Sequence, residues 1–351
     1  MLRGTVSATR WITVGLIFAG VSCADDTGAA SPTSGRGNRP DVSSENTVTP
    51  NDGRDPDTSK PGTIDSEDDD PTALGEVPEG FLADVDGRWK TLITGQWELA
   101  SGEETYRCVR FTLPEGVSIG SMRALSPTGT HHTVLSIADE DDDTADGISE
   151  CEATTNGKRS LLATGVGSNP FELPAGIGME LQAGQQLLLN LHLFNVSEGT
   201  IQGTSGTLIR VMSAADIKQR AEFVLAGPVD LDLPARETSV QRGTCTLTHD
   251  ATLFALFPHM HQLGIHFKAV ANSSVDGTVV LHDGDYSFDS QLTYPLERRI
   301  RMQAGDTVDV ECTYNNTTDK QVTWGDSSLA EMCFAGLYRY PASDTSYLCL
   351  E

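Results

Sequence analysis

Apolar and polar residues alternate in short runs from about Phe81 to the end of the chain. Many of these runs stop at Gly, Asn or Asp, and no long stretch repeats apolar residues at the helical period. Alternation with a period of two is typical of strands, and the stopping residues favour turns. Clear examples are GQQLLLNLHLFNVSEG, TLIRVMSA, GTVVLHDG and AGDTVDVECTYNN. The pattern predicts an all-β fold of antiparallel jelly rolls or β-sandwiches.

The strand pattern is interrupted near residues 213 to 224, where the sequence reads SAADIKQRAEF. This stretch favours a short helix and marks a boundary between two folded halves. We therefore expect two tandem β-sandwich domains, at residues 81–216 and 217–351, a division that the length of 351 residues allows.

The first 23 residues predict export. Arg3 and Arg10 precede the apolar run WITVGLIFAG, which is too short to span a bilayer as a mature helix and suits a secretory signal. The run leads to GVSC, where small residues before Cys23 resemble the lipobox of bacterial lipoproteins, although Gly20 stands where leucine is usual. We expect lipidation at Cys23, with ordinary signal cleavage as the alternative.

Acidic and small polar residues dominate residues 24–80. Because this segment has few aliphatic side chains to bury, it cannot offset the entropy lost on ordering, and it is predicted to be a disordered tether. The formal net charge of -26 argues against a nucleic-acid partner, because phosphate binding needs a basic face. The run ADEDDDTADG after Ile137 lacks EF-hand spacing, so it predicts a solvated loop rather than a calcium site.

If the chain is exported, the six cysteines after Cys23 are expected to form disulfides, because disulfides persist in oxidising compartments. If each half folds separately, Cys108 pairs with Cys151. The four cysteines of the second half allow three pairings: Cys245, Cys312, Cys333 and Cys349.

The motif PHMHQLGIH places His259 and His261 two positions apart, so on a strand both imidazoles share one face at a spacing suited to one metal ion. They continue the apolar row of Leu253, Ala255 and Phe257. Two histidines in such a row would be costly to bury without partners, and solvent-facing or hydrogen-bonded histidines are the alternative. His266 has the opposite parity and is expected to be structural, and His249 and His282 are expected to be surface or packing residues.

A second histidine set lies in the first half. His131 and His132 can share a metal only where their strand begins or kinks, which Gly129 permits. In LLLNLHLF both strand faces are apolar except at Asn190 and His192. A lone buried histidine is commonly a core residue, but together with His131 and His132 it completes a three-histidine set.

Met332 is the candidate further ligand for the His259 and His261 pair, because the adjacent Cys333 could fix it through a disulfide. Methionine ordinarily fills core space. As a ligand, its soft thioether favours copper, particularly Cu(I), over zinc. Two metal sites are therefore predicted, one with three imidazoles and one with two imidazoles and a thioether.

These residues resemble the copper type II, ascorbate-dependent monooxygenases, the family of peptidylglycine α-hydroxylating monooxygenase and dopamine β-monooxygenase. The resemblance covers roughly residues 85 to 351 and runs in order through HHTVL, NLHLF, PHMHQLG, VECTY and EMCFAGLYRYP. It implies two packed jelly-roll-like domains with one copper each, facing a shared solvent-filled cleft.

The resemblance also implies a role for particular residues. The electron-transfer copper would be held by His131, His132 and His192, with Tyr106 nearby, and the O2-binding catalytic copper by His259, His261 and Met332. For Tyr106, a core aromatic role is the alternative. The family's disulfide pattern would join Cys108 with Cys151, Cys245 with Cys349 and Cys312 with Cys333.

The implied reaction is hydroxylation of a substrate C–H bond with O2, in which ascorbate reduces both coppers in single-electron steps. Two departures limit the substrate. Phe257 occupies the position of the arginine that grips the carboxylate in the peptide-amidating enzyme, and Phe334 and Gly336 replace its asparagine and tyrosine. These changes argue against peptide amidation and indicate a more apolar pocket.

The sequence thus predicts a secreted or surface-tethered bacterial copper monooxygenase with a small-molecule substrate and O2 as partners. Contact with a membrane is expected only through a lipid anchor at Cys23. A non-catalytic copper-storage lipoprotein is the alternative, and a β-sandwich adhesion module with coincidental histidines is a third hypothesis, which predicts no stoichiometric copper.

Overall fold

The computed structural model describes residues 80–350 except 140–141, 153–154, 166, 289, 326–328 and 344–347. The predicted signal, Cys23 and all but the last residue of the acidic tether lie outside the described residues. The described residues belong to one compact unit. Their secondary structure is strands apart from one short 3-10 helix, η1, at Ala214–Asp216, which confirms the all-β prediction. Among these residues we find no helix with the length and apolar character needed to cross a membrane.

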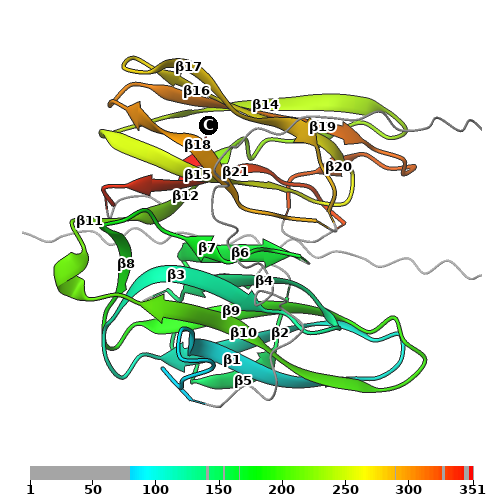
Figure 1. The fold of residues 1–351 in the computed structure, drawn as a ribbon. Helices are drawn as coiled ribbons and strands as arrows, with labels where there is room; N and C mark the ends of the chain where they lie inside the picture. Colours follow the sequence, from blue (N-terminus) through cyan, green and yellow to red (C-terminus); the bar gives the residue numbers. More distant parts are fainter. Residues whose placement is uncertain are drawn as a thin grey trace, which may run out of the picture. The chain divides into compact units, whose positions relative to one another are not determined.

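The first group of strands contains β1 to β10, which precede η1, and β11, which follows it (Figure 1). These eleven strands pair only with one another. One sheet has the order β1-β10-β3-β8-β11, with β7 added on β3, and the other has the order β5-β2-β9-β4-β6. Their bounds are β1 Lys90–Leu99, β2 Glu104–Thr112, β3 Val117–Leu125, β4 Thr130–Ile137, β5 Gly147–Glu150, β6 Arg159–Gly165, β7 Phe171–Glu172, β8 Ile177–Leu181, β9 Gln186–Phe194, β10 Ile201–Val211 and β11 Gln219–Arg220.

The remaining eleven described strands form the sheets β18-β15-β21-β12-β22 and β14-β19-β16-β17 and the small pair β13-β20. Their bounds are β12 Glu222–Gly227, β13 Asp232–Leu233, β14 Thr238–Thr246, β15 Ala251–Met260, β16 Gly264–Ser273, β17 Gly277–Asp285, β18 Tyr294–Met302, β19 Thr307–Asn315, β20 Val322–Thr323, β21 Cys333–Tyr340 and β22 Leu348–Leu350. Because β11 pairs with β8, the chain passes from the first group to the second after Arg220. The domain division at residue 216 stays a prediction.

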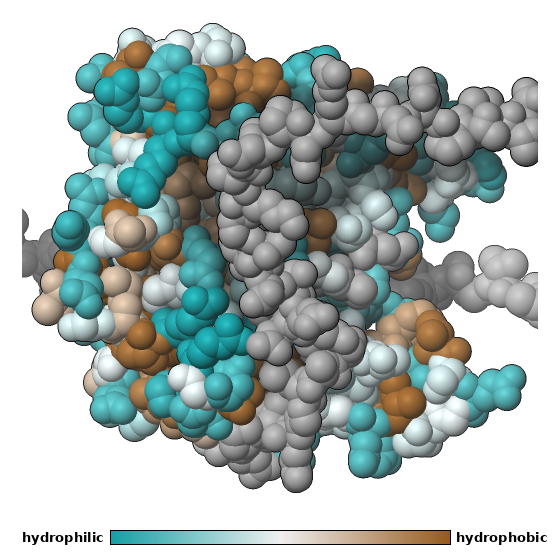
Figure 2. Space-filling view, viewed as in Figure 1, coloured by the Kyte–Doolittle hydropathy of each residue, from teal (hydrophilic) through white to brown (hydrophobic). Residues whose placement is uncertain are grey.

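Two large apolar cores hold the sheets together. The first core fills the first group of sheets and continues into β15 and β21 through Phe254, Phe257 and Tyr338. Phe171 of β7 packs on Tyr338, with ring centroids 4.3 Å apart. Burial of aromatic side chains of this size is a main source of stability, so the two groups of strands share a continuous apolar contact. On the face seen in Figure 2, small hydrophobic areas are scattered among hydrophilic ones.

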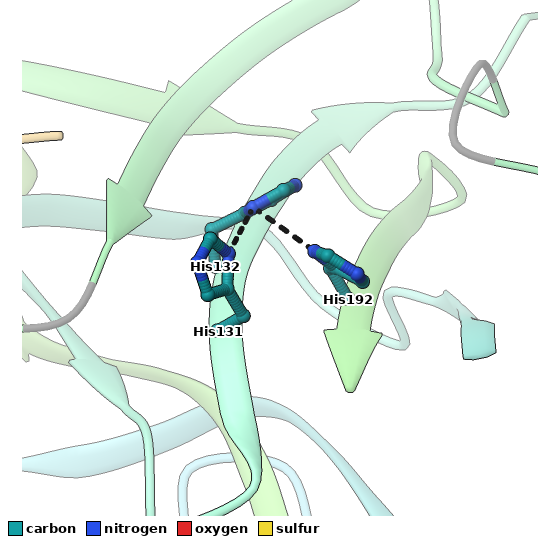
Figure 3. Close-up of side chains that lie close together, drawn as sticks. All are labelled: His131, His132 and His192. Atoms are coloured by element: carbon teal, nitrogen blue, oxygen red, sulfur yellow. Dashed lines mark hydrogen bonds between the residues drawn. The ribbon is translucent and has the colours of Figure 1, made fainter. Parts of the chain in front are cut away.

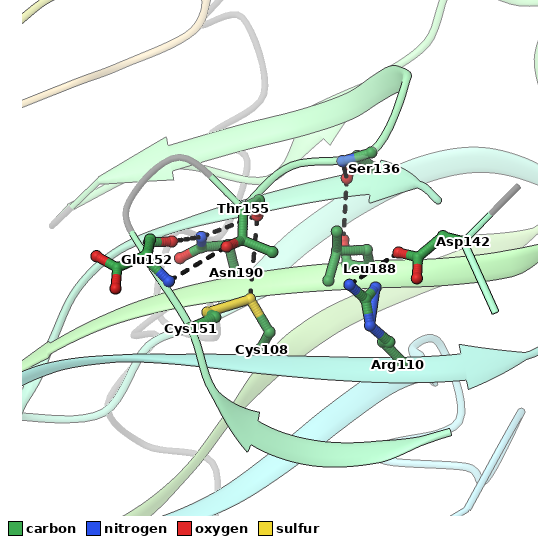
Figure 4. The surroundings of a disulfide bond; sticks show 10 residues. Cys108, Arg110, Ser136, Asp142, Cys151, Glu152, Thr155, Leu188 and Asn190 are labelled. Carbon is green, nitrogen blue, oxygen red and sulfur yellow. Dashed lines mark hydrogen bonds and ion pairs between the residues drawn. A yellow bond between two sulfur atoms is a disulfide. The ribbon is translucent and has the colours of Figure 1, made fainter. Parts of the chain in front are cut away.

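All three disulfides implied by the family resemblance are present: Cys108–Cys151, Cys245–Cys349 and Cys312–Cys333. Figure 4 shows the first of them beside Asn190, whose amide donates to the carbonyl oxygens of Glu152 and Thr155, both at 3.0 Å. These bonds explain why an asparagine can interrupt an apolar strand face. The disulfides fit folding in an oxidising compartment.

The predicted acidic loop after Ile137 joins β4 to β5. Asp142 forms an ion pair with Arg110 at 2.9 Å, and Asp146 accepts a hydrogen bond from the Thr112 amide at 2.9 Å (Figure 4 shows the first). These two carboxylates therefore hold the loop against β2.

Candidate metal centre

His131 and His132 point to the same place because their strand is irregular at its start. In the ladder between β4 and β9, Thr130 pairs with Leu193 and His132 pairs with His192, so His131 is the extra residue of a bulge. A bulge re-aims a side chain that would otherwise face the opposite side. Gly129, directly before the strand, has a φ of 104°, a conformation that favours glycine. The predicted kink is confirmed.

His192 completes this histidine set from the neighbouring strand β9. The Nδ1 atom of His132 lies 3.1 Å from that of His131 and 3.4 Å from that of His192, as the dashed lines in Figure 3 mark. One nitrogen from each of the three rings lies within 4.8 Å of the others. Three imidazole nitrogens gathered this closely are a suitable donor set for a transition metal.

Two residues of β2 hold the His192 ring. The Nε2–H of His192 donates to the Glu104 carboxylate at 2.7 Å, which leaves Nδ1 as the atom for a metal. Tyr106 stacks on the same imidazole, with ring centroids 4.4 Å apart and planes 5° apart. Sequence reasoning identified Tyr106 but missed Glu104, although its position two residues before Tyr106 places both on one strand face.

The surroundings favour the neutral form of two of these imidazoles, His132 and His192. Burial lowers the pKa of His132 well below its ordinary value, and the neighbouring His192 and His131 add to the effect. Burial also lowers the pKa of His192, with Glu104 opposing the shift. A neutral imidazole offers the lone pair that metal binding needs.

In the second histidine set, His259 lies on β15 and His261 lies just after the strand end at Met260. The expected continuous row from Leu253 to His259 is wrong, because a bulge between Leu253 and Ala255 shifts the register. Leu253 therefore packs in the second core, whereas Ala255 and Phe257 pack in the first. The two imidazoles are nevertheless close, with ring centroids 5.2 Å apart.

Hydrogen bonds orient both rings of this set. The Nδ1–H of His259 donates to the side-chain oxygen of Gln291 at 2.9 Å, and the Nδ1–H of His261 donates to the Ala330 carbonyl at 3.0 Å. Each bond selects the tautomer in which Nε2 carries the lone pair for a metal. Burial lowers the pKa of His259 to about 3, with His261 adding to the shift.

Met332 lies next to the Cys312–Cys333 disulfide, and its carbonyl accepts a hydrogen bond from the buried Tyr314 hydroxyl at 2.6 Å. The preceding residue, Glu331, is fully buried and accepts hydrogen bonds from the amides of His261 at 2.9 Å and Leu263 at 2.7 Å. Burial raises the pKa of Glu331 to about 7, against the effect of its backbone hydrogen bonds. Glu331 thus ties the turn after His261 to the segment that carries Met332.

A cavity of about 580 Å³ is lined by His132 of the first set and by His259 and Met332 of the second. Phe288, from the segment between β17 and β18, contacts rings of both sets, with centroids 5.4 Å from His131 and 6.3 Å from His261. The three-histidine set and the pair of His259 and His261 therefore lie on either side of Phe288, and Met332 lines the same cavity as His132 and His259. A separate cavity of about 470 Å³, near Phe81 and Ile93, includes none of the six predicted ligands in its described lining.

The remaining histidines lie elsewhere. His266 forms a contact with Asp283 at 3.2 Å, His282 packs between Phe267 and Tyr294, and His249 lies 3.8 Å from Glu222. All three have packing or ionic neighbours in the second group of sheets.

The C-terminal part of the chain matches a known family, and two human proteins are similar to the chain. Residues 222–351 match the family described as copper type II ascorbate-dependent monooxygenase, C-terminal domain. "Putative DBH-like monooxygenase protein 2" of Homo sapiens is 22% identical over 275 residues, covering 70% of this chain and 55% of that protein. "DBH-like monooxygenase protein 1" of Homo sapiens is 24% identical over 208 residues, covering 52% of this chain and 33% of that protein. The chain spans about half of the first relative's length and a third of the second's.

Solved structures of infectious bursal disease virus were also matched. For the Gt strain structure, identity is 11% and the TM-score is 0.20, over 78% of this chain and 77% of that chain. For the T=1 particle at 2.6 Å, identity is 12% and the TM-score is 0.21, over 77% and 74%. Scores this low carry no argument about fold or function.

The fold and its side chains define an all-β protein with a three-histidine donor set and a second histidine set near a methionine. The match of residues 222–351 and the similarity of the two relatives support the resemblance to the copper type II ascorbate-dependent monooxygenase family.

Proposed function

We propose that the chain is an exported copper monooxygenase that hydroxylates a C–H bond of a small substrate, with O2 as oxidant and ascorbate or a similar one-electron donor as reductant. The observation that carries the proposal is the pairing of two different donor sets beside one cavity: three Nδ1 atoms in the first, and two Nε2-presenting histidines with Met332 nearby in the second. Storage of copper alone would not need two sets of different chemistry.

The residues present fit copper. Imidazole suits copper in both oxidation states, and a thioether favours Cu(I). His131, His132 and His192 would hold one ion, and His259, His261 and Met332 would hold a second. Copper bound there would supply the one-electron redox chemistry with which O2 is used.

Residues of the chain orient the histidine rings and place apolar side chains around the cavity. Gln291 and the Ala330 carbonyl fix the tautomers of the second histidine set, and Glu104 fixes that of His192. Phe257 and Phe334 line the cavity next to His259 and limit access of water. Tyr314 and Glu331 hold the backbone on either side of the Met332 side chain.

We further propose that Cys23 is a lipid anchor that tethers the enzyme to a bacterial envelope through the acidic segment 24–80. The disulfides support export. Mass spectrometry of the purified chain would detect an acylated Cys23 at the mature N-terminus. Cleavage without acylation would contradict the anchor and leave the enzymatic proposal intact.

Replacing Met332 with isoleucine tests the catalytic proposal, because it removes the thioether and retains an apolar side chain of similar volume. We expect ascorbate-dependent O2 uptake to fall at least about 100-fold, since a residue that binds the metal should matter more than one that only hydrogen-bonds to a ligand, whose loss costs about 10- to 100-fold. X-ray absorption on the reduced protein should show a sulfur scatterer that the variant lacks. Met260→Ile is the matched control, because Met260 is buried in the second core. Unchanged uptake in Met332→Ile would contradict the assignment of Met332 as a ligand, and absent uptake in the unchanged chain would favour a copper-storage protein.

Replacing Gln291 with leucine should weaken copper(I) binding at the second set about 10- to 100-fold, because His259 loses the acceptor that fixes its tautomer. Gln291→Glu keeps an acceptor oxygen and should retain more affinity. The Gln291 backbone carbonyl accepts from the Gly165 amide at 3.2 Å, a contact that neither change removes. Competition with a chromophoric copper(I) chelator measures the effect. Equal affinities for Gln291→Leu and the unchanged chain would show that this hydrogen bond does not orient the ligand.

A further inference from the structure

The cavity beside His259 and Met332 is walled by residues of both groups of strands. Val134 and Ala163 come from β4 and β6, and Leu225 and Phe334 come from β12 and β21. Its volume of about 580 Å³ falls within the range of small-molecule sites, which is about 300 to 1,000 Å³. The cavity can therefore enclose a compact organic molecule next to the second histidine set.

Large apolar side chains line the cavity together with His259 and Met332. They include Phe223, Leu225, Phe257, Trp324, Phe334 and Leu348. Gly336 makes part of this wall possible, because a Cβ atom there would overlap the ring of Phe223 and lie 3.1 Å from the Cβ of Phe257. Glycine at position 336 thus lets the Phe223 ring lie directly against the backbone of β21 at the cavity.

Charged partners for a substrate are missing from the described lining, which contains no Asp, Glu, Lys or Arg. Several of its polar groups already bond within the protein. Thr133 and Thr164 bond each other at 2.8 Å, and Gln291 bonds His259 and the Phe288 carbonyl. A charged group brought into such a cavity would lose its hydration and gain no opposite charge.

We infer that the substrate of the proposed monooxygenase is an uncharged, predominantly apolar molecule, held by the aromatic and aliphatic wall with its reactive C–H bond toward His259 and Met332. The inference rests on the proposed function in treating the bound molecule as a substrate. The preference for uncharged molecules depends only on the side chains that line the cavity. Carboxylates and ammonium compounds of the same shape are poor ligands.

Three adamantane derivatives of one shape and different charge test the inference: 1-adamantanemethanol, 1-adamantanemethylammonium and 1-adamantanecarboxylate. Binding to the full chain is measured by calorimetry and by Trp324 emission, under argon, with and without copper(I). In the copper-free chain, the neutral alcohol should bind at least about 30-fold more tightly than either ion, because no Asp, Glu, Lys or Arg lines the described cavity wall. Trp324→Phe should abolish the emission change and retain the calorimetric signal.

The variant Leu225→Arg should reverse the preference of the cavity for the uncharged ligand. Leu225 lines the cavity, is half-buried, and is none of the six proposed ligands. The arginine should improve carboxylate binding at least about tenfold relative to the alcohol by supplying a charge partner. Leu225→Met, which adds no charge, should leave the order of affinities unchanged. Val229→Arg serves the same purpose if Leu225→Arg does not fold, because Val229 also lines the cavity and is half-buried.

Binding of either ion within threefold of the alcohol, no binding of the alcohol, or no gain of carboxylate binding in a folded arginine variant would each overturn the inference. Failure of the proposed function is distinguished from failure of this inference by a different measurement. It appears as absent ascorbate-dependent O2 uptake by the copper-loaded chain, a result that leaves the three binding constants unchanged.

Discussion

Replacing His132 with alanine is expected to remove copper from the three-histidine set. The Nδ1 atom of His132 is the one that lies within 3.4 Å of the Nδ1 atoms of both other rings. Its loss leaves two nitrogens from His131 and His192. We expect the copper affinity of this set to fall by more than about 100-fold, which exceeds the effect of losing a residue that only hydrogen-bonds to a ligand. Copper measured after dialysis should decrease by one ion per chain, and the spectrum of Cu(II) in the remaining site should persist.

His282→Ala is the matched control for this change. It removes the same side chain from β17, where His282 packs against Tyr294 with ring centroids 4.7 Å apart and contacts neither histidine set. The control should bind as much copper as the unchanged chain. Equal copper content in His132→Ala and His282→Ala would contradict the assignment of the first set as a metal site.

Replacing Glu222 with alanine is expected to destabilise the fold by about 3 to 5 kcal/mol, because it leaves a buried guanidinium without its carboxylate. Glu222 and Arg339 are 7% and 5% exposed, and the Nε–H of Arg339 donates to Glu222 at 2.8 Å. The pair joins the start of β12 to β21, the strand that begins beside Met332. Denaturant unfolding of the oxidised protein measures the change in the free energy of unfolding.

Two variants separate loss of the ion pair from loss of packing. Asp319→Ala breaks the exposed pair of Arg236 and Asp319, which should change stability by no more than about 1 kcal/mol. The double change Glu222→Leu with Arg339→Met removes both buried charges and should restore most of the stability that Glu222→Ala loses. If Glu222→Ala unfolds like Asp319→Ala, the buried pair does not contribute as its burial suggests.

Much of the candidate site could be predicted because local residue order restricts where metal donors can lie. Adjacent His131 and His132 required a kink, and the structure has a bulge there. The spacing of His259 and His261 placed two imidazoles together, with centroids 5.2 Å apart. The order of five motifs also fixed the disulfide partners through the family resemblance, and all three pairs are present.

The supporting residues could not be predicted in the same way. Gln291 lies 32 residues from His259 and Glu104 lies 88 residues from His192, and neither glutamine nor glutamate has a local pattern that marks it as a partner of histidine. Glu331 stands in the quoted motif beside Met332, but its burial and its bonds to the amides of His261 and Leu263 depend on how the segment folds back. The bulge at Leu253 was likewise missed, because one extra residue leaves the alternation of apolar residues almost unchanged.

The sequence by itself determined the all-β class and the identity of the six candidate ligands, because strand periodicity and residue chemistry are local properties of the chain. Folding then decided which ring nitrogen is left for a metal in His192, His259 and His261. It also decided that Phe288 contacts both sets, and that the described cavity wall carries no charged side chain. These features arise from contacts between segments far apart in the chain, which no local pattern encodes.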